Sequence, residues 1–398
     1  MRILQVNSVC GVGSTGRIAT DIHHELTANG HVSMIAFGRN EAKNCDNVYR
    51  IGLMKNILAD VFMTRVFDRH GTMGKQATRE FCAMIDAYQP DLVHLHNIHG
   101  YYLNIGMLMR YLKYKNIPVV WTLHDCWSFT GHCAYFDFPK CDRWKYACGS
   151  CPRLHDYPES WLLDHSRQNL ASKKELFSDF KNLTIITPSL WLKDLVKQSF
   201  LGVYPVEVIN NGIDLTKFRP VPSDLRSRYG LEGKRVYVSV AMVWDRRKGL
   251  DDLLALSNRL NDDEKLILIG LAKNQLAQLP ANILGIQRTN SVDELAAFYA
   301  MADVTVVPSY EDNYPTVVLE SLACHTPVIA YRTGGIPEMG DDPYVRLVPK
   351  GALDALLTLL RTTPSDLPWD QDFSRMDKQV SALAYVDQYQ RIQGKVGE

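Results

Sequence analysis

The fold is decided by the stretch Val236–Val240 (VYVSV) and the ten residues after it, AMVWDRRKGL. The five residues are mostly β-branched or aromatic, which is typical of a buried β-strand. Leucines at 253, 254, 256 and 260 then follow the spacing of one helix face. A strand, a short loop and a helix in this order form the repeating unit of a parallel, doubly wound sheet.

The same alternation runs along the chain in two series. Strand-like runs lie at 3–6, 33–37, 92–96, 119–123 and 184–188, and then at 206–209, 236–240, 265–269, 304–307 and 328–330. Helix-like segments such as Val292–Met301 separate them. We therefore expect an α/β protein of two Rossmann-like, doubly wound domains. The predicted domains are 1–200 and 201–371, and a helical tail at 372–398 is expected to pack back on the first.

Composition narrows the class of ligand. The 398 residues include 44 lysines and arginines and 44 aspartates and glutamates, so no overall positive field favours nucleic acid. The start of the chain does not resemble a signal peptide, and no apolar run reaches the ~20 residues that span a bilayer. Nine cysteines then indicate reduced thiols or metal ligands, which predicts a cytoplasmic protein.

A glycine-rich loop follows the first strand. Residues 11–16 read GVGSTG and precede a helical run at 18–29. The pattern formally matches a dinucleotide-binding loop. In such loops an acidic residue further along binds the ribose, but this chain has Arg39 at that place. Glycines also let backbone N–H groups approach an oxyanion, so we expect Gly13, Ser14 and Gly16 to contact an anionic ligand. A plain tight turn is the alternative.

Charged residues in the second half indicate a phosphate site. Arg246, Arg247 and Lys248 stand directly before a helical pattern, where cations and a helix N-terminus attract an anion. A second loop, PSYEDNYPT at 308–316, leads into another helix, with Asp312 before it and Glu320 two turns inside. Carboxylates at these positions accept hydrogen bonds from sugar hydroxyls. The alternative is that these charges form a helix face that binds no ligand.

These motifs resemble those of retaining glycosyltransferases of the GT-B fold, family 4. The matching segments are DRRKG at 245–249, Asp312-x7-Glu320, HTPVI at 325–329, TGGIPE at 333–338, NNGID at 210–214 and His124-Asp125. Among that family, HLHN at 94–97, WTLHD at 121–125 and a cysteine-rich insertion are similar to bacterial exopolysaccharide enzymes of the colanic acid cluster type. Two positions depart from the family pattern, since Met242 replaces an arginine and Asp312 replaces a glutamate.

The resemblance implies transfer of a hexosyl or deoxyhexosyl group from a nucleotide-diphosphate sugar to a saccharide. We expect this saccharide acceptor to be linked to a lipid. The resemblance also implies that the two domains face each other with the active cleft between them. The first domain would bind the acceptor and the second the donor. Donor contacts are then expected from Gly13, Ser14, Gly16, Arg246, Arg247, Lys248, Asn313, Tyr314, Pro315, Thr316 and Glu320. The catalytic set would be His124, Asp312 and Glu320, and no metal is needed for the reaction.

Histidines at two strand ends mark the acceptor side. His96, Asn97 and His99 follow one strand and are expected to contact the acceptor, with loop capping as the alternative. His124 follows the next strand and would support charge that develops on the sugar; otherwise it is a buried histidine bonded to backbone. Asp125 is expected to orient His124 or a backbone amide.

A possible membrane surface lies at 51–74, where apolar residues alternate with Lys55, Arg65 and Arg69. Residues 1–190 also carry 21 lysines and arginines against 17 aspartates and glutamates. The pattern fits a helix that packs on the core, or a face that contacts anionic lipid at the inner side of the plasma membrane.

Four cysteines fall within nineteen residues, at Cys133, Cys141, Cys148 and Cys151. The C-x2-C pair allows two thiolates to reach one ion, and four thiolates complete a tetrahedral structural zinc site. In this hypothesis His132 or His155 is an alternative for one of the ligands, and disulfides or unrelated thiols are the alternatives to zinc. For the whole chain, a nicotinamide-dependent oxidoreductase and a non-catalytic saccharide-binding subunit are the rival functions.

Overall fold

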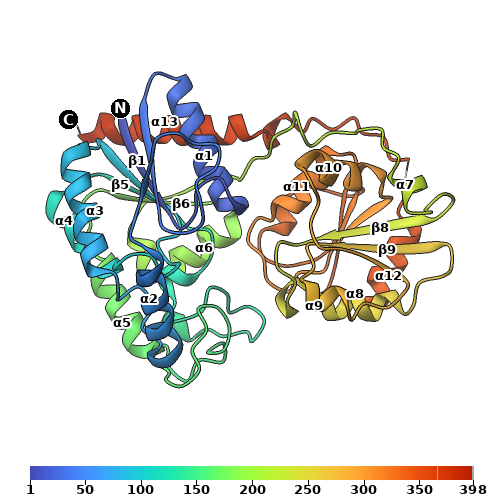
Figure 1. Ribbon diagram of the computed structural model, residues 1–398, viewed down its shortest axis with the longest axis horizontal. Coiled ribbons are helices and arrows are strands. Elements are labelled where there is room, and N and C mark those ends of the chain that lie inside the picture. Colours follow the sequence, from blue (N-terminus) through green and yellow to red (C-terminus); the bar gives the residue numbers. More distant parts are fainter. Residues whose placement is uncertain (365, 397–398) are drawn as a thin grey trace. The chain divides into compact units, whose positions relative to one another are not determined.

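The computed structural model describes residues 1–364 and 366–396, which divide into two units (Figure 1). The first unit comprises Met1–Asn210 and the described residues from Ser381 onward, and the second comprises Asn211–Val380. Each unit has one parallel sheet with helices on both faces. The predicted α/β architecture is therefore confirmed.

The first sheet has seven parallel strands in the order β3-β2-β1-β4-β5-β6-β7. They are β1 (Arg2–Asn7), β2 (Val32–Phe37), β3 (Val48–Arg50), β4 (Leu92–Leu95), β5 (Val119–Thr122), β6 (Leu183–Thr187) and β7 (Val206–Val208). The helices are α1 (Gly13–Ala28), α2 (Met54–Phe67), α3 (Lys75–Tyr88), α4 (Ile105–Lys115), α5 (Ser166–Phe177) and α6 (Leu190–Gln198), with short 3-10 turns η1 (Trp127–Phe129), η2 (Arg143–Lys145) and η3 (Phe200–Val203).

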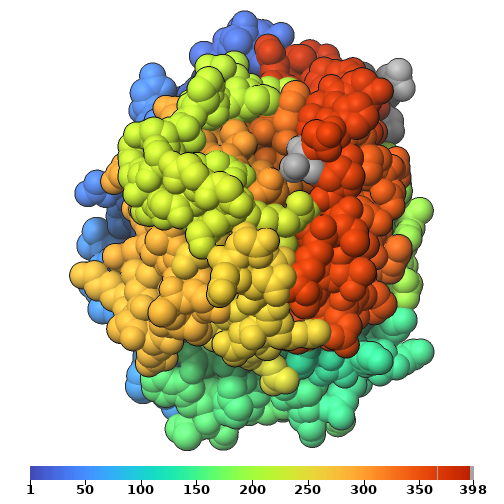
Figure 2. Space-filling model, turned by 90° about the vertical axis from the view of Figure 1, so that its right-hand side faces the viewer, coloured from blue at the N-terminus to red at the C-terminus, as the bar shows by residue number. Residues whose placement is uncertain are grey.

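The second sheet has six parallel strands in the order β10-β9-β8-β11-β12-β13. They are β8 (Arg235–Val240), β9 (Glu264–Ile269), β10 (Ile283–Ile286), β11 (Val304–Val307), β12 (Val328–Tyr331) and β13 (Val345–Val348). The helices are α7 (Leu225–Arg228), α8 (Leu250–Ser257), α9 (Lys273–Leu276), α10 (Val292–Met301), α11 (Thr316–Ala323) and α12 (Leu353–Thr362), with 3-10 turns η4 (Arg246–Lys248), η5 (Ile336–Glu338) and η6 (Ser374–Met376). In Figure 2 the yellow segment with α8 and the red α12 occupy adjoining parts of one face, in line with the packing of α12 on α8.

Central strands are buried on both faces, as expected for parallel sheets covered by helices. All four residues of β4, β5, β11 and β12 are buried. A continuous apolar core in the first unit runs from β1 through β6 to the segment at 126–148. These rigid strands hold the loops at their carboxyl ends, where ligands of such folds bind.

The chain leaves the first unit ten residues later than the sequence predicts. The run at 206–209 forms β7, which pairs with β6 in register Ile185↔Val206 and so belongs to the first sheet. The sequence did not reveal this because an apolar strand carries no mark of the sheet it joins. The boundary therefore falls at 210/211 instead of 200.

The C-terminal helix also begins later than predicted. α13 spans Lys378–Val396, and its first residues belong to the second unit, where Lys378 Nζ lies 2.8 Å from Asp214 Oδ2. From Ser381 the helix packs on the first unit, with Tyr385 and Tyr389 buried against β1, β4 and β5. Residues 397–398 of the predicted helix lie outside the described residues.

Candidate active site

The cationic loop of the second unit follows β8 directly. Asp245 Oδ1 accepts a hydrogen bond from the Lys248 backbone N–H at 2.9 Å and so caps η4. Gly249 then adopts φ 74°, and a Cβ there would lie 2.2 Å from the carbonyl oxygen of Pro308. Only glycine permits both this conformation and this approach. The turn therefore brings the cations against the loop that follows β11.

Lys248 and Asp312 form an ion pair across these two loops. Lys248 Nζ lies 2.5 Å from Asp312 Oδ2, and Arg247 donates a hydrogen bond to the Glu311 carbonyl at 3.0 Å. Burial alone would raise the pKa of Asp312, but the charges of Lys248 and Arg247 hold that pKa below its usual value. The sequence placed these residues 64 positions apart, and the fold joins them. The third cation, Arg246, is exposed.

Glu320 lies inside α11 and is 2% exposed. The hydroxyl of Tyr299 on α10 donates to Glu320 Oε2 at 3.0 Å. Asn313, Tyr314 and Pro315 form the loop before the helix, and Thr316 is its first residue. Gly334, at φ 51°, brings the TGG segment against this loop, because a Cβ there would lie 1.7 Å from the Asp312 carbonyl oxygen. The structure thus gathers Lys248, Asp312 and the N-terminus of α11 in one unit.

The glycine loop of the first unit differs from the prediction. α1 begins at Gly13, five residues before the predicted start, so that Gly13, Ser14 and Gly16 all lie in its first turns. Gly11 has φ 66°, and a Cβ there would lie 2.0 Å from the carbonyl oxygen of Lys43. Packing against the 38–47 segment explains the need for glycine at 11 without any ligand. Contact of Gly13, Ser14 and Gly16 with the donor stays a prediction.

Polar side chains meet at the carboxyl ends of β4 and β5. His96 Nδ1 lies 3.2 Å from His124 Nε2, and His96 Nε2 lies 3.1 Å from Gln5 Oε1. Gln5 is fully buried within β1 and also donates to the Ala19 carbonyl at 3.0 Å. The sequence analysis missed Gln5, although an amide inside the apolar strand ILQV was a usable signal. Gln5 and His96 together hold the His124 ring in place.

Asp125 orients a different histidine from the one predicted. Asp125 Oδ2 lies 3.1 Å from His99 Nε2, and Asp125 Oδ1 accepts from the Trp127 backbone N–H at 2.9 Å. The other His99 nitrogen, Nδ1, lies 2.9 Å from the Tyr157 hydroxyl. The contact with the Trp127 backbone agrees with the prediction. The pairing with His99 was not predicted, because the course of the chain after β4 decides which histidine reaches Asp125. Asn97 is half-buried, and its backbone N–H donates to Asn7 Oδ1 at 3.3 Å.

Burial sets the protonation of this cluster. It lowers the pKa of His124 to about 4 and that of His96 well below its usual value, so both imidazoles are neutral near pH 7. Burial would raise the pKa of Asp125, yet the charge and hydrogen bond of His99 hold it below its usual value. The strand ends therefore present neutral imidazoles and one carboxylate.

A cavity of about 580 Å³ lies beside this cluster within the first unit. His70 and Trp127 line it, and their rings lie 6.3 and 5.1 Å from the His99 ring. Lys173 on α5 also lines it. Its volume is in the range of small-molecule sites. No pattern in the sequence pointed to it, because its walls come from four separate segments.

Four cysteines predicted to bind zinc line one small pocket. The thiols of Cys133 and Cys151 interact directly. Among the described residues, however, no three ligand atoms of this cluster lie within 4.8 Å of one another. No disulfide joins any of the nine cysteines, all of which the structure describes.

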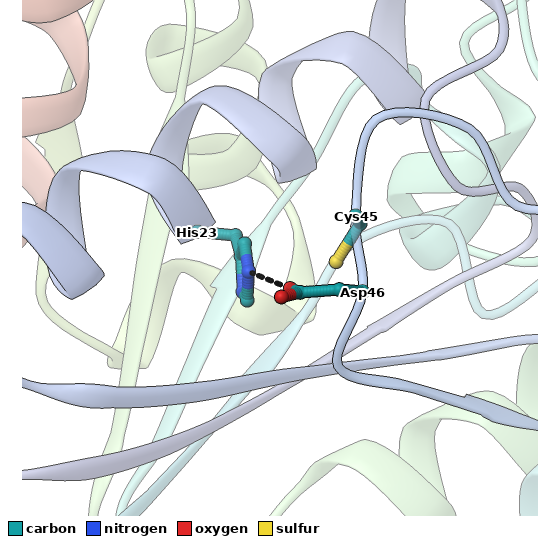
Figure 3. Close-up of side chains that lie close together, drawn as sticks. All are labelled: His23, Cys45 and Asp46. Atoms are coloured by element: carbon teal, nitrogen blue, oxygen red, sulfur yellow. Dashed lines mark ion pairs between the residues drawn. The ribbon is translucent and has the colours of Figure 1, made fainter.

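Figure 3 shows the group that does meet this spacing, His23, Cys45 and Asp46. His23 Nε2 lies 3.6 Å from Asp46 Oδ1, but the Asp46 side chain is 99% exposed. Three ligands with one of them fully in solvent form a weak metal site. We assign no function to this group.

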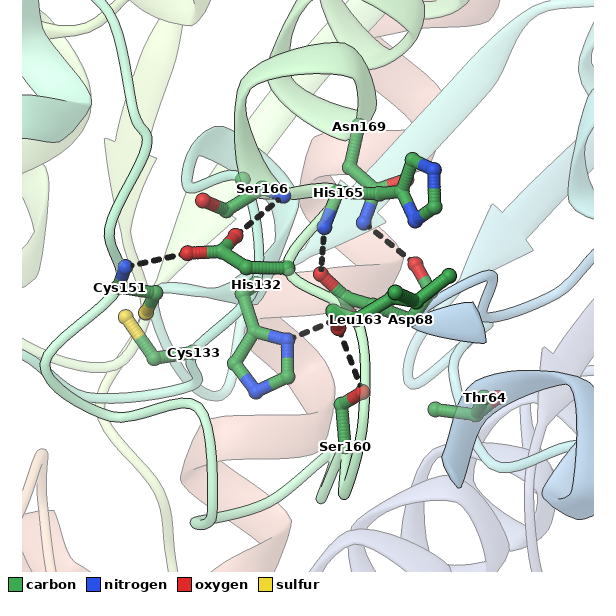
Figure 4. A network of polar contacts seen from close by, with 12 residues as sticks. Thr64, Asp68, His132, Cys133, Cys151, Ser160, Leu163, His165, Ser166 and Asn169 are labelled. Atoms are coloured by element: carbon green, nitrogen blue, oxygen red, sulfur yellow. Dashed lines mark hydrogen bonds and ion pairs between the residues drawn. The ribbon is translucent and has the colours of Figure 1, made fainter. Parts of the chain in front are cut away.

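The two histidines considered as alternative zinc ligands have other partners. His132 Nδ1 lies 2.6 Å from Asp68 Oδ1 (Figure 4). His155 Nδ1 lies 3.0 Å from the Ser160 carbonyl oxygen. Asp68 also accepts from the His165 backbone N–H at 2.9 Å. These contacts tie the 126–165 segment to the end of α2.

The predicted amphipathic stretch forms α2 and the loop after it. Ile57 is buried, whereas Leu53, Met54, Leu58 and Phe62 are exposed. Exposed Trp161, Leu162 and Leu163 lie on a loop joined to α2, because the Trp161 backbone N–H donates to the Arg65 carbonyl at 2.6 Å. Within the described part of the chain, no helix is both long and apolar enough to cross a bilayer.

Two Rossmann-like sheets with charged side chains at the carboxyl ends of their strands define the GT-B class of glycosyltransferase fold. Comparison with known proteins then gives the family. The model of glycosyltransferase family 4 matches residues 15–217, and that of group 1 glycosyl transferases matches 234–362. The chain belongs to this family, which confirms the resemblance predicted from the sequence and decides against the nicotinamide-dependent alternative.

Among curated proteins, the chain is 28% identical over 355 residues to the putative colanic acid biosynthesis glycosyl transferase WcaC of Escherichia coli, covering 85% of each. It is 31% identical over 159 residues to the putative teichuronic acid biosynthesis glycosyltransferase TuaC of Bacillus subtilis, covering 38% of this chain and 40% of TuaC.

Solved structures show the same fold. The sucrose-phosphate synthase of Thermosynechococcus elongatus has TM-score 0.71 and 18% identity, covering 99% of this chain and 100% of that one. HepE of Anabaena in complex with UDP-glucose has TM-score 0.62 and 15% identity, covering 100% and 99%.

Proposed function

We propose that this glycosyltransferase moves a hexosyl or deoxyhexosyl group from a nucleotide-diphosphate sugar to a saccharide acceptor during synthesis of a surface polysaccharide. The names of WcaC and TuaC support the process, and the bound UDP-glucose of HepE supports the donor class. The observation that carries the proposal is the Lys248–Asp312 pair beside Arg247 and the start of α11. Such a group of cations and free N–H groups suits a diphosphate.

On the donor side, each residue has a separate task in this proposal. Lys248 and Arg247 neutralise the diphosphate, so that it departs as a stable anion. Asp312 then exchanges part of its contact with Lys248 for the donor sugar, together with the backbone of 313–316. Glu320 accepts hydrogen bonds from the nucleotide ribose, and Gly13, Ser14 and Gly16 approach the phosphates. Because the cations and helix terminus supply the positive charge, the step requires no metal ion.

On the sugar itself, His124 supports the charge that develops at the transferred carbon. A neutral imidazole suits this task, because an imidazolium would repel an oxocarbenium-like sugar. We propose that the reaction retains the anomeric configuration, as the resemblance to retaining enzymes implies. The anomeric proton coupling of the product, measured by NMR, distinguishes retention from inversion.

On the acceptor side, we propose that His96, Asn97 and His99 bind a saccharide, and that the acceptor is linked to a lipid. Exposed apolar side chains on α2 support a peripheral contact with anionic membrane on the cytoplasmic side. The cavity of about 580 Å³ beside His99 gives the acceptor room within the first unit.

The donor site is tested by isothermal titration with UDP, GDP, CMP and NAD. We expect one nucleoside diphosphate to bind. Lys248→Ala should weaken its binding by about 1.5–3 kcal/mol, the range for hydrogen bonds to charged groups. Glu320→Gln should weaken binding of the nucleotide and leave binding of a free sugar unchanged. Lys234→Ala is the matched control, because Lys234 lies before β8, at the other end of the strand from the cationic loop. Unchanged affinity in both site variants would show that the donor site is wrongly assigned.

A further inference from the structure

The segment at 123–165 connects β5 to α5 with almost no regular structure. Apart from η1 and η2 it consists of turns and loops. It nevertheless contains buried side chains, among them Phe129, Phe136 and Trp144, whose rings lie 4.9 to 6.4 Å apart. A long loop without its own hydrogen-bonded framework needs another means of holding its shape.

Four cysteine side chains line one pocket inside this segment. Cys133, Cys141, Cys148 and Cys151 all line one small pocket, with room of about 10 Å³. That is about the least space in which a single water fits. The pocket is flanked by Phe136 and Trp144, so the thiols lie in mostly apolar surroundings. The fold has brought together cysteines up to eighteen positions apart around a space that suits one small ion.

One backbone N–H group points at a thiol, and a carboxylate holds the backbone of another cysteine. The Gly131 backbone N–H points at Cys148 Sγ, 3.3 Å away, and the Cys151 backbone N–H donates to Asp164 Oδ2 at 2.6 Å. Gly131 is required there, because a Cβ would lie 2.0 Å from the Ser166 carbonyl oxygen and 2.8 Å from Cys148 Cβ. N–H groups directed at sulfur stabilise a thiolate more than a neutral thiol.

A buried lysine lies near the cluster. Lys173 on α5 is 7% exposed, and its Nζ donates to the carbonyls of Trp127 and Thr130 at 2.5 and 2.9 Å. Within the described residues no carboxylate lies at ion-pair distance from it. Burial lowers the pKa of Lys173 to about 7, while the thiols of Cys133 and Cys148 and the carboxylates of Asp68 and Asp125 favour its charged form. A buried ammonium with no carboxylate at ion-pair distance gains stability from further negative charge nearby.

We propose that Cys133, Cys141, Cys148 and Cys151 bind one zinc ion as thiolates, with the Lys173 ammonium as a buried counter-charge. Binding releases four thiol protons to solvent and leaves a centre of net charge −2, because four thiolates surround a dication. Lys173 cancels half of that charge. The proposal concerns the folding of the segment and does not depend on the proposed function.

The proposal requires rotation of the cysteine side chains, because no three of the four sulfurs lie within 4.8 Å of one another. A Zn–S distance of about 2.3 Å puts tetrahedral sulfurs about 3.8 Å apart. A change between staggered χ1 rotamers moves a cysteine sulfur by about 3 Å. Because the four side chains already line one pocket, the proposal invokes only such rotations and no change in the backbone course.

Metal analysis of the full chain, purified without chelator, is the first test. We expect about one zinc per chain, lost in Cys148→Ser and in Cys151→Ser. Cys45→Ser is the matched control, since Cys45 belongs to the separate group with His23 and Asp46. Zinc lost in Cys45→Ser and kept in Cys148→Ser would overturn the proposal, as would wild-type protein without zinc.

Cobalt replacement tests the ligands even where a variant folds poorly. Wild-type protein stripped of zinc and loaded with Co²⁺ should show thiolate-to-cobalt charge-transfer bands and the visible bands of a tetrahedral site. Absence of thiolate bands would contradict four-sulfur ligation.

The counter-charge is tested with Lys173→Met, which keeps the length of the side chain. We expect this variant to lose zinc to a competing chelator about tenfold more readily than wild type. Lys174→Met, at the half-buried neighbouring position, should behave as wild type. Equal zinc retention in both variants would remove Lys173 from the proposal.

Discussion

His94, inside β4, and His124, just after the neighbouring strand β5, have different surroundings. His94 is fully buried, with one nitrogen 2.8 Å from Thr122 Oγ1 and the other 2.6 Å from the Tyr389 hydroxyl. His124 is half-buried and contacts His96 through Nε2. Because both ring nitrogens of His94 have buried polar partners, we expect a structural role for His94. His124 is partly exposed, so a ligand can reach it.

His124→Ala should therefore lower kcat by about 100-fold, the range for removal of one group that stabilises developing charge. Nucleotide affinity should not change, because the contact is made to the sugar in the transition state. His94→Ala is the control, and it should lower the free energy of unfolding instead. Steady-state kinetics with nucleotide titration separate these outcomes, and equal loss of kcat and affinity in His124→Ala would indicate a structural histidine.

The pH dependence of the same histidine follows from its burial. With a pKa of about 4, His124 is neutral at every pH above about 5. We expect kcat to show no titration of His124 between pH 6 and 8. The wild-type pH profile tests this when compared with that of His124→Gln, since a wild-type step near pH 6.5 that the variant lacks would contradict it.

Glu264 gives the second unit a different dependence on pH. Burial would raise its pKa, but Arg361, the Asn261 N–H and Tyr237 lower that pKa to about 2. A carboxylate with a lower pKa in the folded state stabilises the fold above its unfolded pKa, and this stability is lost as pH falls from about 4.5 to 2. The difference between the two pKa values corresponds to at most about 3 kcal/mol of the free energy of unfolding. Urea unfolding at pH 7 and at pH 3 should show a smaller pH effect in Glu264→Gln, and an equal effect would refute the assignment.

At the scale of elements, α2 presents an apolar face to solvent. Phe62 is 59% exposed and Leu58 62%, while Arg65 stacks over the exposed ring of Trp161 at 4.9 Å. A soluble protein seldom exposes so many large apolar side chains on adjoining segments without a partner. The flanking cations favour an anionic partner.

Wild-type protein should float with anionic liposomes at low salt, and Leu58→Ser with Phe62→Ser should abolish most of this binding. High salt should weaken it, because screening shortens the reach of the cations to about 8–10 Å at physiological ionic strength. Val203→Ser, which removes an exposed apolar residue elsewhere on the first unit, is the control. Equal flotation of all three proteins would show that α2 is not the membrane contact.

Edge strands explain which elements the sequence missed. β3, β10 and β13 were not predicted, and each lies at an edge of its sheet. An edge strand needs less apolar surface, so its pattern is weaker than that of a central strand. The central strands β8 and β11, buried throughout or nearly so, and the helix α10 were predicted within a residue or two of their observed bounds.

At the scale of the whole molecule, the last helix completes the first unit. Tyr389 of α13 bonds to His94, 295 positions earlier, and Gln393 donates to the Asp91 carbonyl at 2.7 Å. The first unit is thus built from both ends of the chain (Figure 1). Its stability must depend on residues that follow the second unit in sequence.

Tyr389→Phe should destabilise the first unit by about 1–3 kcal/mol, because His94 Nδ1 loses its buried partner. Hydrogen exchange should become faster in β4 and β5 and stay unchanged in the second sheet. Tyr114→Phe, at an exposed position of α4, is the control and should change neither. Faster exchange in both sheets of Tyr389→Phe would contradict the division into two units.

The sequence by itself determined the α/β class, the family and the charged motifs, because apolar periodicity and short glycine-rich or charged loops are local properties of the chain. The tertiary structure alone decided the pairing of Lys248 with Asp312, of His99 with Asp125 and of Tyr389 with His94. It also decided that the strand at 206–208 belongs to the first sheet. These contacts join residues from separate strands and loops, and their partners are selected by the order of strands in the sheet, which no local pattern encodes.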